Sequence, residues 1–238
     1  LPAFRSAPKE GSFFFLSAPI FSTLVNASKT KQPQFEIDWR DGLTPQAISD
    51  GDELNGLSVI RQVLKRLDPA TLNGRIIAVL IVNTPAFYAH QAFSPVDGKK
   101  MNRCFPGRKD GSASERIAYR LLHNAVRQAD YCIDLHQGGV RPMIDEVRVR
   151  VDRRKRIHRA CMEMAQVFGI GYILDQRGPE GQLARSAPDE GIPTIDPELG
   201  GCHGWDAGSI QKGITGVENV MKHYGLIDGK PHIPEKQV

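Results

Sequence analysis

Three polar residues in two distant segments of this chain have the types and the spacing of metal ligands. Asp50 and Glu53 lie in the motif Asp50-Gly51-Asp52-Glu53-Leu54-Asn55-Gly56, and His136 ends an apolar segment some eighty residues later. A carboxylate at a helix start and an imidazole at a strand end often share a zinc ion, with one coordination position left for water. These residues therefore predict metal-assisted hydrolysis. Such a site normally has a histidine in the place of Asp50.

A third segment supplies a candidate general base. Glu198 ends another apolar segment, and Gly200 and Gly201 follow it, so that a ligand can approach the backbone closely. Simpler explanations remain open for the metal ligands. Glu53 also suits the first turn of a helix, where the dipole favours carboxylates. His136 taken alone would more often be a hydrogen-bonded core residue than a ligand.

The segment Asn102-Arg103-Cys104-Phe105-Pro106-Gly107 predicts a site for a carboxylate group. The planar guanidinium of Arg103 beside the amide of Asn102 can hold a carboxylate with two parallel hydrogen bonds. A surface turn explains the same residues equally well. Cys104 is not expected to be a nucleophile, because no histidine or other base lies near it in the sequence.

Composition excludes several classes of protein. The chain has 238 residues, 40% hydrophobic and 24% charged residues and a net charge of +4, which is typical of a soluble globular protein. The basic stretch 148–159 lacks interleaved aromatic residues, so it favours a solvated helix face over nucleic-acid binding. The four cysteines show no short-spaced pair, which indicates a reducing compartment. No apolar run reaches the roughly 18 residues that a membrane span needs.

Strands and helices are expected to alternate along most of the chain. Apolar periodicity, capping residues and Gly or Pro breaks predict helices at 53–67, 112–125, 154–168 and 209–223 and strands at 76–82, 131–135, 171–174 and 192–199. This order predicts a three-layer α/β/α fold with a mostly parallel mixed central sheet. Ligands of such folds bind beyond the carboxyl ends of the strands, where His136 and Glu198 are expected. Residues 84–111 are predicted to be a long, functional loop.

These motifs, in this order, closely resemble those of the succinylglutamate desuccinylase/aspartoacylase family, whose members are related to the zinc carboxypeptidases. The resemblance covers residues 51–225 and includes the motif around Glu53, the segment 102–107, Asp134-Leu135-His136 and Glu198-Leu199-Gly200-Gly201. It implies a zinc carboxypeptidase-like fold. It further implies one Zn²⁺ per chain and hydrolysis of the amide of an N-acylated amino acid.

Residue roles can be carried over position by position. The resemblance implies that Glu53 and His136 bind zinc, that Glu198 is the general base, and that Asn102 and Arg103 bind the substrate. Arg185 could add a second positive charge at the substrate. Asp50 stands where the family has its first zinc-ligand histidine, so Mn²⁺ or another divalent ion is a second possibility. The chain also has Lys100 where the family usually has an acidic residue, and Pro197 directly before Glu198.

The expected organisation is an irregular N-terminal segment with two short strands (1–48), a catalytic domain (49–227) and a disordered tail or linker (228–238). A signal peptide is the less favoured interpretation of the apolar N-terminal stretch. The family's C-terminal β-rich domain is expected to be absent.

The expected function is a zinc-dependent deacylase that cleaves the acyl group from an N-acylated amino acid or a similar small amide. The alternative is a catalytically impaired relative that binds a small carboxylate ligand without turnover, because Asp50 replaces the histidine. We expect a cytoplasmic protein with a small-molecule substrate, no nucleic-acid or membrane partner, and a possible homo-oligomeric state.

Overall fold

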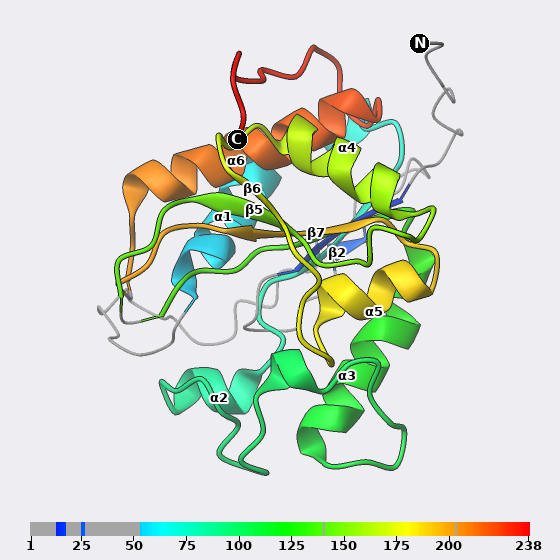
Figure 1. Cartoon of the computed structure of the whole chain (residues 1–238), viewed down its shortest axis with the longest axis vertical. Coiled ribbons are helices and arrows are strands. Elements are labelled where there is room, and N and C mark those ends of the chain that lie inside the picture. The colour runs from blue at the N-terminus through cyan, green and yellow to red at the C-terminus, as the bar shows by residue number, and fades with distance from the viewer. Residues whose placement is uncertain (1–12, 18–24, 27–52, 140, 203) are drawn as a thin grey trace.

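The described part of the chain forms one mixed β-sheet with helices on both faces (Figure 1). The computed structural model describes residues 13–17, 25–26, 53–139, 141–202 and 204–238. The strands of the sheet stand in the order β2-β3-β1-β4-β7-β5-β6. Their bounds are β1 Phe13–Ser17, β2 Val25–Asn26, β3 Arg75–Val79, β4 Tyr131–Asp134, β5 Glu146–Val149, β6 Ile173–Asp175 and β7 Thr194–Glu198. The expected three-layer α/β/α fold is confirmed.

Most neighbouring strands run parallel. Strand β1 pairs in parallel with β3 and β4, β4 with β7, and β5 with β6, whereas β2 and β5 are antiparallel to β3 and β7. Because β5 runs against β7, the start of β5 lies beside the carboxyl end of β7. The two segments therefore bring their side chains to the same edge of the sheet.

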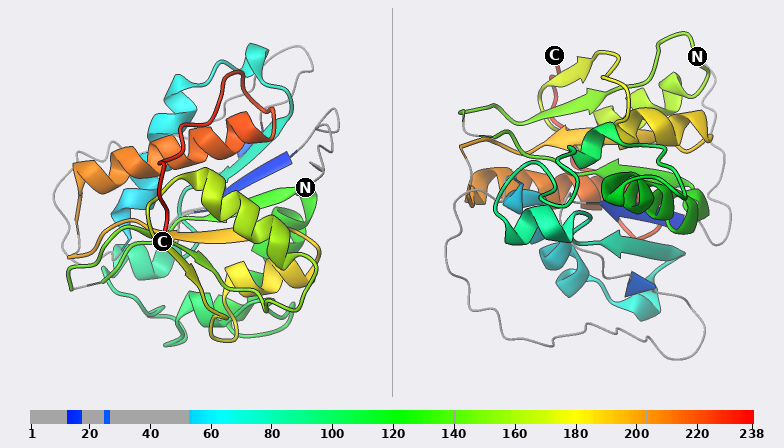
Figure 2. Two further views of the ribbon diagram at one scale, coloured as in Figure 1. Left: turned by 45° about the horizontal axis from the view of Figure 1, so that its top comes forward. Right: turned by 90° about the horizontal axis from the view of Figure 1, so that it is seen from below.

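Within the described ranges, six α-helices flank the sheet, and they lie on both of its sides (Figures 1 and 2). Helices α1, α4 and α6 cover one side, and α2, α3 and α5 lie on the other. Their bounds are α1 Leu54–Arg66, α2 Thr84–Tyr88, α3 Ala113–Asn124, α4 His158–Phe168, α5 Leu183–Asp189 and α6 Ala207–His223, with short 3-10 turns at Pro69–Thr71, Met101–Arg103 and Val126–Gln128.

The two faces of the sheet bury different cores. The larger core packs α1, α4 and α6 against Ile133, Leu135, Val147 and Ile195, which all point to one face. Residues that alternate with them along the strands, such as Cys132, point to the other face and to α3 and α5. The polar site residues share that second face, and this places the candidate site on the side of α2, α3 and α5.

Helix α6 approaches its neighbours closely through glycines. A Cβ atom at Gly216 would lie 2.3 Å from a ring carbon of Phe168, and one at Gly213 would lie 2.6 Å from Val59. Small residues at these two places let α6 pack tightly against both α4 and α1. The start of α1, and with it Glu53, is thereby fixed relative to the sheet.

Several elements differ from the sequence expectation. Strand β5 and helix α5 lie where no element was expected, and the expected loop 84–111 contains α2 and the turn Met101–Arg103. The expected tail 228–238 is not disordered: the backbone of Val238 exchanges two 2.8 Å hydrogen bonds with Gly171 and Ile173 beside β6. These bonds extend the edge of the sheet and hold the tail in place.

Most of the expectation for residues 1–48 lies outside the described residues. Within that segment, two strands occur as expected, but they do not pair with each other. Strand β1 lies between β3 and β4, and β2 pairs with the far side of β3. None of the helices in the described ranges has the length and hydropathy of a membrane span.

Candidate active site

The backbone brings His136 and Glu198 side by side. Beyond the last paired residues of β4 and β7 the ladder continues, because the N–H of His136 donates to the Pro197 carbonyl at 2.8 Å and Leu199 donates to the His136 carbonyl at 2.9 Å. Proline lacks an N–H, but its carbonyl still takes part in the ladder. Pro197 is therefore compatible with the strand, and both site residues stand at the same carboxyl edge of the sheet.

The imidazole of His136 lies between two carboxylates. Its Nδ1 is 2.8 Å from Oε2 of Glu53, at the start of α1, and its Nε2 is 3.0 Å from Oδ2 of Asp134 in its own strand. His136 and Asp134 are buried, with 6% and 4% of their surfaces exposed. Burial lowers the pKa of His136, but the carboxylates of Glu53, Asp134 and Asp196 outweigh it and hold that pKa well above its ordinary value. The pocket thus favours a positive charge at this point.

Asn55 fixes the position of Glu53. This fully buried side chain donates from Nδ2 to the Leu199 carbonyl at 2.9 Å and accepts from the Asp206 backbone N–H at 3.0 Å. The backbone N–H of Asn55 donates to the side chain of Gln137 at 3.0 Å. One asparagine therefore ties the start of α1 to the segments that follow β4 and β7 and to the start of α6.

Glu53 and His136 fit a metal ion by chemistry and by direction, since a carboxylate oxygen and a ring nitrogen face each other. Two ligands of a tetrahedral zinc with bonds of 2.0–2.1 Å lie roughly 3.3 Å apart, so a small separation of these side chains would admit the ion. Asp134 on the other ring nitrogen matches the carboxylate–histidine–metal arrangement that orients such ligands. Asp50, the third expected ligand, lies outside the described residues. Within the described ranges, no cluster of three or more His, Cys, Asp or Glu side chains forms a complete metal site.

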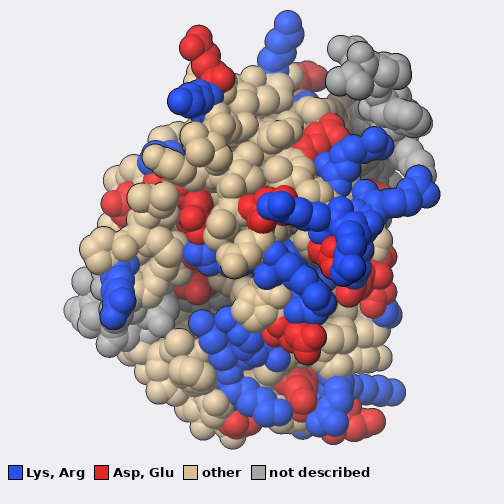
Figure 3. All heavy atoms as spheres, viewed as in Figure 1, with Lys and Arg blue, Asp and Glu red and all other residues tan. Residues whose placement is uncertain are grey.

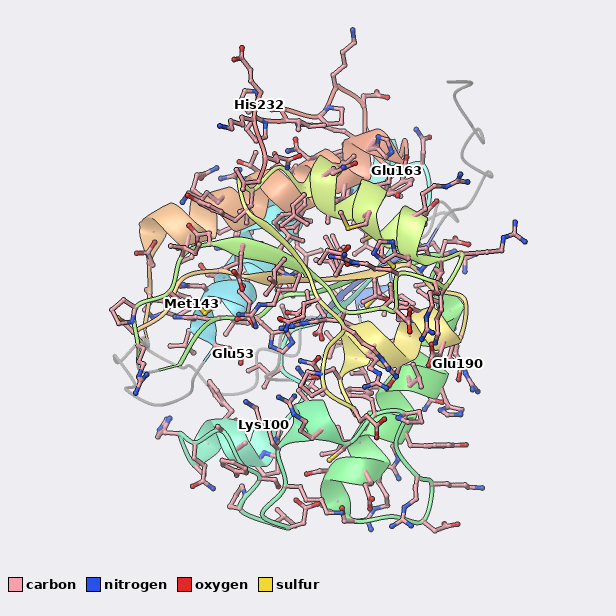
Figure 4. The ribbon with its side chains drawn as sticks, viewed as in Figure 1. Glu53, Lys100, Met143, Glu163, Glu190 and His232 are labelled. Carbon is pink, nitrogen blue, oxygen red and sulfur yellow. The ribbon has the colours of Figure 1, made fainter. Side chains whose placement is uncertain are left out.

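A cavity of about 680 Å³ opens in front of these residues. In Figure 3 a depression with Lys and Arg side chains around it lies between the upper and lower parts of the molecule. Figure 4 shows the labelled Glu53 and Met143 on the upper side of this region and Lys100 on the lower side, and all three line the cavity. Its charged lining residues are Glu53, Lys100, Arg103, Arg148, Arg150, Arg177 and Glu198.

Strand β5 and the residue just after it supply two arginines that were missed by the sequence expectation. Arg148 binds Oε1 of Glu198 through Nη1 and Oε1 of Glu146 through Nε, and Arg150 Nε lies 3.0 Å from Asp196 Oδ2. Each arginine contacts a carboxylate of the neighbouring strand β7 along a diagonal across the sheet, and not straight across from its own position. The alternation of Val147, Val149 and Val151 with charged residues is a strand signal that could have revealed this wall of the cavity.

The carboxyl group of Glu198 is a candidate base because its pKa is shifted toward neutrality. Burial raises the pKa, as do the nearby carboxylates of Asp196 and Glu53, whereas His136 and Arg148 lower it, and the net pKa is about 7. A carboxylate with such a pKa can both accept and return a proton near neutral pH.

Of the three residues expected to bind substrate, two line the cavity and one does not. Asn102 and Arg103 line the cavity. The amide oxygen of Asn102 accepts from Leu183 N at 3.1 Å, and its Nδ2 lies 3.3 Å from Nε2 of His136. Arg103 is exposed and its guanidinium contacts the Asn102 carbonyl. Arg185 is not among the described residues that line the cavity, and it donates to the Gly178 carbonyl and to Glu180.

A glycine explains how the Arg103 segment is held. Gly181 has a φ of +79°, and a Cβ atom there would lie 2.2 Å from the backbone oxygen of Arg103. The N–H of Phe105 donates to the Gly181 carbonyl at 3.1 Å. This contact fixes Arg103 at the rim of the cavity.

The order of the sheet and the helices on its two faces form an α/β fold of the zinc carboxypeptidase-like type. The family model of the succinylglutamate desuccinylase/aspartoacylase catalytic domain matches residues 45–224, and the chain belongs to this family. A curated relative, the N-alpha-acetyl-L-2,4-diaminobutyric acid deacetylase of Halomonas elongata, is 32% identical over 189 residues. The match covers 78% of this chain and 55% of the relative, so the chain spans about half the length of that protein.

Solved structures have the same fold. The product-bound structure of an ectoine utilization protein from Ruegeria pomeroyi superimposes with a TM-score of 0.77 at 24% identity and covers 95% of this chain and 61% of the other. A succinylglutamate desuccinylase/aspartoacylase from Rhodobacter sphaeroides gives 0.75 at 25% identity, with 95% and 59% covered. The sheet and its flanking helices therefore match known members of the family.

Proposed function

We propose that this chain is the catalytic part of a metal-dependent deacylase that hydrolyses the amide of an N-acylated amino acid or a similar small amide. The observation that carries the proposal is the meeting of Glu53, His136 and Glu198 at one cavity, although they come from three distant segments. Membership of the family and the deacetylase name of the Halomonas elongata relative support the same reaction class.

Glu53 and His136, together with Asp50, would hold the ion, Zn²⁺ in the first place and Mn²⁺ as the second candidate. When bound, such an ion polarises a carbonyl oxygen and lowers the pKa of a water molecule. Glu198 would take the proton of the attacking water and deliver it to the nitrogen of the leaving amine. Its place beside His136 suits both transfers.

Arg103 and Asn102 would bind the carboxylate of the substrate. Arg103 is exposed at the rim and has no acidic partner among the described residues, so its charge is available to a ligand. The Asn102 side chain reaches both His136 and the start of α5, and this links the ligand position to the site.

A second candidate function is the binding of a small carboxylate ligand without turnover. Two observations favour it: Asp50 stands in the place of a histidine, and Arg148 holds the carboxylate of Glu198 in an ion pair. In that case the basic rim would still bind an anion, but Glu198 would not act as a base.

The substitution Glu198→Gln separates the two functions. Glu198 is not a metal ligand in this proposal, so bound metal should stay the same. Hydrolysis of N-acyl amino acids should fall about 10²–10⁴-fold, the usual contribution of a general base. Rates and metal content should be measured together, with Glu235→Gln in the tail as the control. An unchanged rate in Glu198→Gln would remove the role of Glu198.

A further inference from the structure

The loop that joins β5 to α4 concentrates the positive charge of the chain. Residues 152–159 include five Lys and Arg residues and one Asp, so this segment has a net charge of +4, the same value as the whole chain. Figure 3 shows Lys and Arg side chains gathered over this loop, which lies at the right-hand end of α4 in Figure 1. The rest of the chain is therefore neutral overall, and the surplus charge is local.

A cavity of about 410 Å³ lies within this loop and the start of α4. Its lining residues are Arg153, Arg154, Lys155, Arg156, His158 and Arg159. The volume is in the range of small-molecule sites. The described residues that line it include no acidic or apolar side chain and no Phe, Tyr or Trp, and none of them lines the active-site cavity. The chemistry of the lining therefore suits an anion.

Carboxylates from the surrounding elements hold part of this lining in place. The ion pairs are Arg153 and His158 with Asp175, Arg154 with Asp152, and Lys155 with Asp189. Arg156 and Arg159 are exposed and have no ion-pair partner within the described ranges. Five Lys and Arg side chains face three carboxylates, which leaves a surplus of two positive charges even without His158. Two guanidinium groups of one cavity are thus available to a ligand.

This distribution of charge works against the stability of α4. The helix begins at His158, the preceding Ile157 supplies no side-chain cap, and none of the residues in the first turn is acidic. Cations at the start of a helix are unfavourable because this end of the dipole is positive, and like charges close together repel one another. Local arrangements that cost stability are expected at functional sites. An anion bound in the cavity would remove the repulsion.

We propose that this cavity binds a compact oligophosphate group. Such a group places several negative charges within a small volume, and the planar fork of a guanidinium holds phosphate oxygens with paired hydrogen bonds. Four of the six lining residues are arginines. Single-stranded nucleic acid fits less well because no aromatic ring is present for base stacking, and a membrane surface fits less well because no apolar side chain can insert. The site is separate from the proposed hydrolysis and does not depend on it.

Calorimetric titration of inorganic triphosphate into the full chain tests the site. We expect one equivalent to bind at least about tenfold more tightly than inorganic phosphate or citrate, because several charged contacts form at once, and salt should weaken the binding. Citrate that binds as tightly as triphosphate would refute the preference for phosphate. Vesicles of phosphatidylcholine with phosphatidylinositol bisphosphate form the second arm, since lipid headgroups carry the same phosphate chemistry. Binding to these vesicles without binding to triphosphate would overturn the assignment to a free oligophosphate.

The double variant Arg156→Gln/Arg159→Gln removes the two guanidinium groups that lack an ion-pair partner. Its affinity for triphosphate should fall at least about tenfold. The matched control is Lys65→Gln/Arg120→Gln, which removes two exposed positive charges from α1 and α3 and should bind triphosphate like the unmodified chain.

A second variant covers a failure of the first to fold. Arg156→Lys/Arg159→Lys keeps both charges but loses the forks, so its affinity for triphosphate should fall at least about threefold. An affinity equal to that of the unmodified chain in the folded variant would refute the site, as would an equal loss of affinity in the control.

Discussion

At the scale of single residues, Asp134 controls the orientation of His136. Its carboxylate lies 3.0 Å from Nε2, so the ring is held with Nδ1 toward Glu53. Partners of this kind fix the tautomer of a ligating histidine and make it a better ligand. Asp134 was noted in the sequence only as a neighbour of His136, but its burial and its contact give it this positioning role.

The substitution Asp134→Asn should weaken metal binding about 10–100-fold, because the amide keeps the shape but loses the charge that orients the ring. Competition with a chelator measures this affinity. Asp110→Asn, an exposed aspartate in another segment, serves as the control. Equal affinities in the two variants would show that His136 does not depend on Asp134.

Some residues of the candidate site could be predicted from the sequence, and others could not. Local signals of helix starts and strand ends made it possible to predict Glu53, His136 and Glu198. The structure brings these three residues together at one cavity. Arg148 and Arg150 were missed because the basic stretch was interpreted as the approach to a helix. Their partners Glu198 and Asp196 lie some fifty residues further along the chain, and no local pattern indicates such a diagonal pair.

At the scale of elements, the capping box of α3 should give the stability of the protein a pH dependence. The side chain of Glu115 accepts from the Ser112 N–H at 2.7 Å and pairs with Arg108 and Lys99. The Ser112 hydrogen bond, followed by the Arg108 contact, lowers the pKa of Glu115 from 4.5 to about 2. Since the folded-state pKa is depressed, this stabilisation is complete above pH 4.5 and is lost as the pH falls toward 2.

The substitution Glu115→Gln tests the charge, because glutamine can keep the hydrogen bond of the capping box. The variant should unfold more easily than the unmodified chain at pH 7, and the difference should shrink between pH 4.5 and about 2. Urea unfolding across this range measures it, with Glu235→Gln as the control. A difference that stays constant with pH would assign the effect to packing rather than to charge.

The helices and strands that could be predicted are those with a local pattern of apolar residues. Helices α1, α3, α4 and α6 follow from apolar spacing, the Ser112 cap and the Gly169 end, and β3, β4 and β7 follow from buried apolar runs. The place of β1 between β3 and β4 could not be predicted, because parallel pairing over sixty or more residues has no local signal.

At the scale of the whole molecule, the sheet separates the larger apolar core from the candidate active site. One face carries the large apolar core with α1, α4 and α6, and the polar site residues line the cavity on the other face. Because β5 runs antiparallel to β7, Arg148 in β5 and Arg150 just after it reach the carboxylates of Glu198 and Asp196 in β7. The result is a cavity with metal-ligand candidates at one end and cations around it.

In the proposed site, Asp50 would decide how well the chain hydrolyses an amide. Two carboxylates and one imidazole around a divalent ion give a neutral set, whereas two imidazoles leave a net positive charge. The extra anion makes the ion polarise water less and favours ions that prefer oxygen ligands, such as Mn²⁺. We therefore expect the chain to be a weak hydrolase. Its activity should rise when histidine replaces Asp50.

The most direct measurement compares bound metal and hydrolysis of a panel of N-acyl amino acids for the unmodified chain and for Asp50→His. We predict that Asp50→His binds zinc more tightly and that its deacylase rate rises together with zinc occupancy. The contradictory result is a gain in zinc occupancy while neither protein hydrolyses any member of the panel. In that case the chain binds small carboxylates without turnover, and the roles proposed for Glu198 and Arg103 in hydrolysis must be withdrawn.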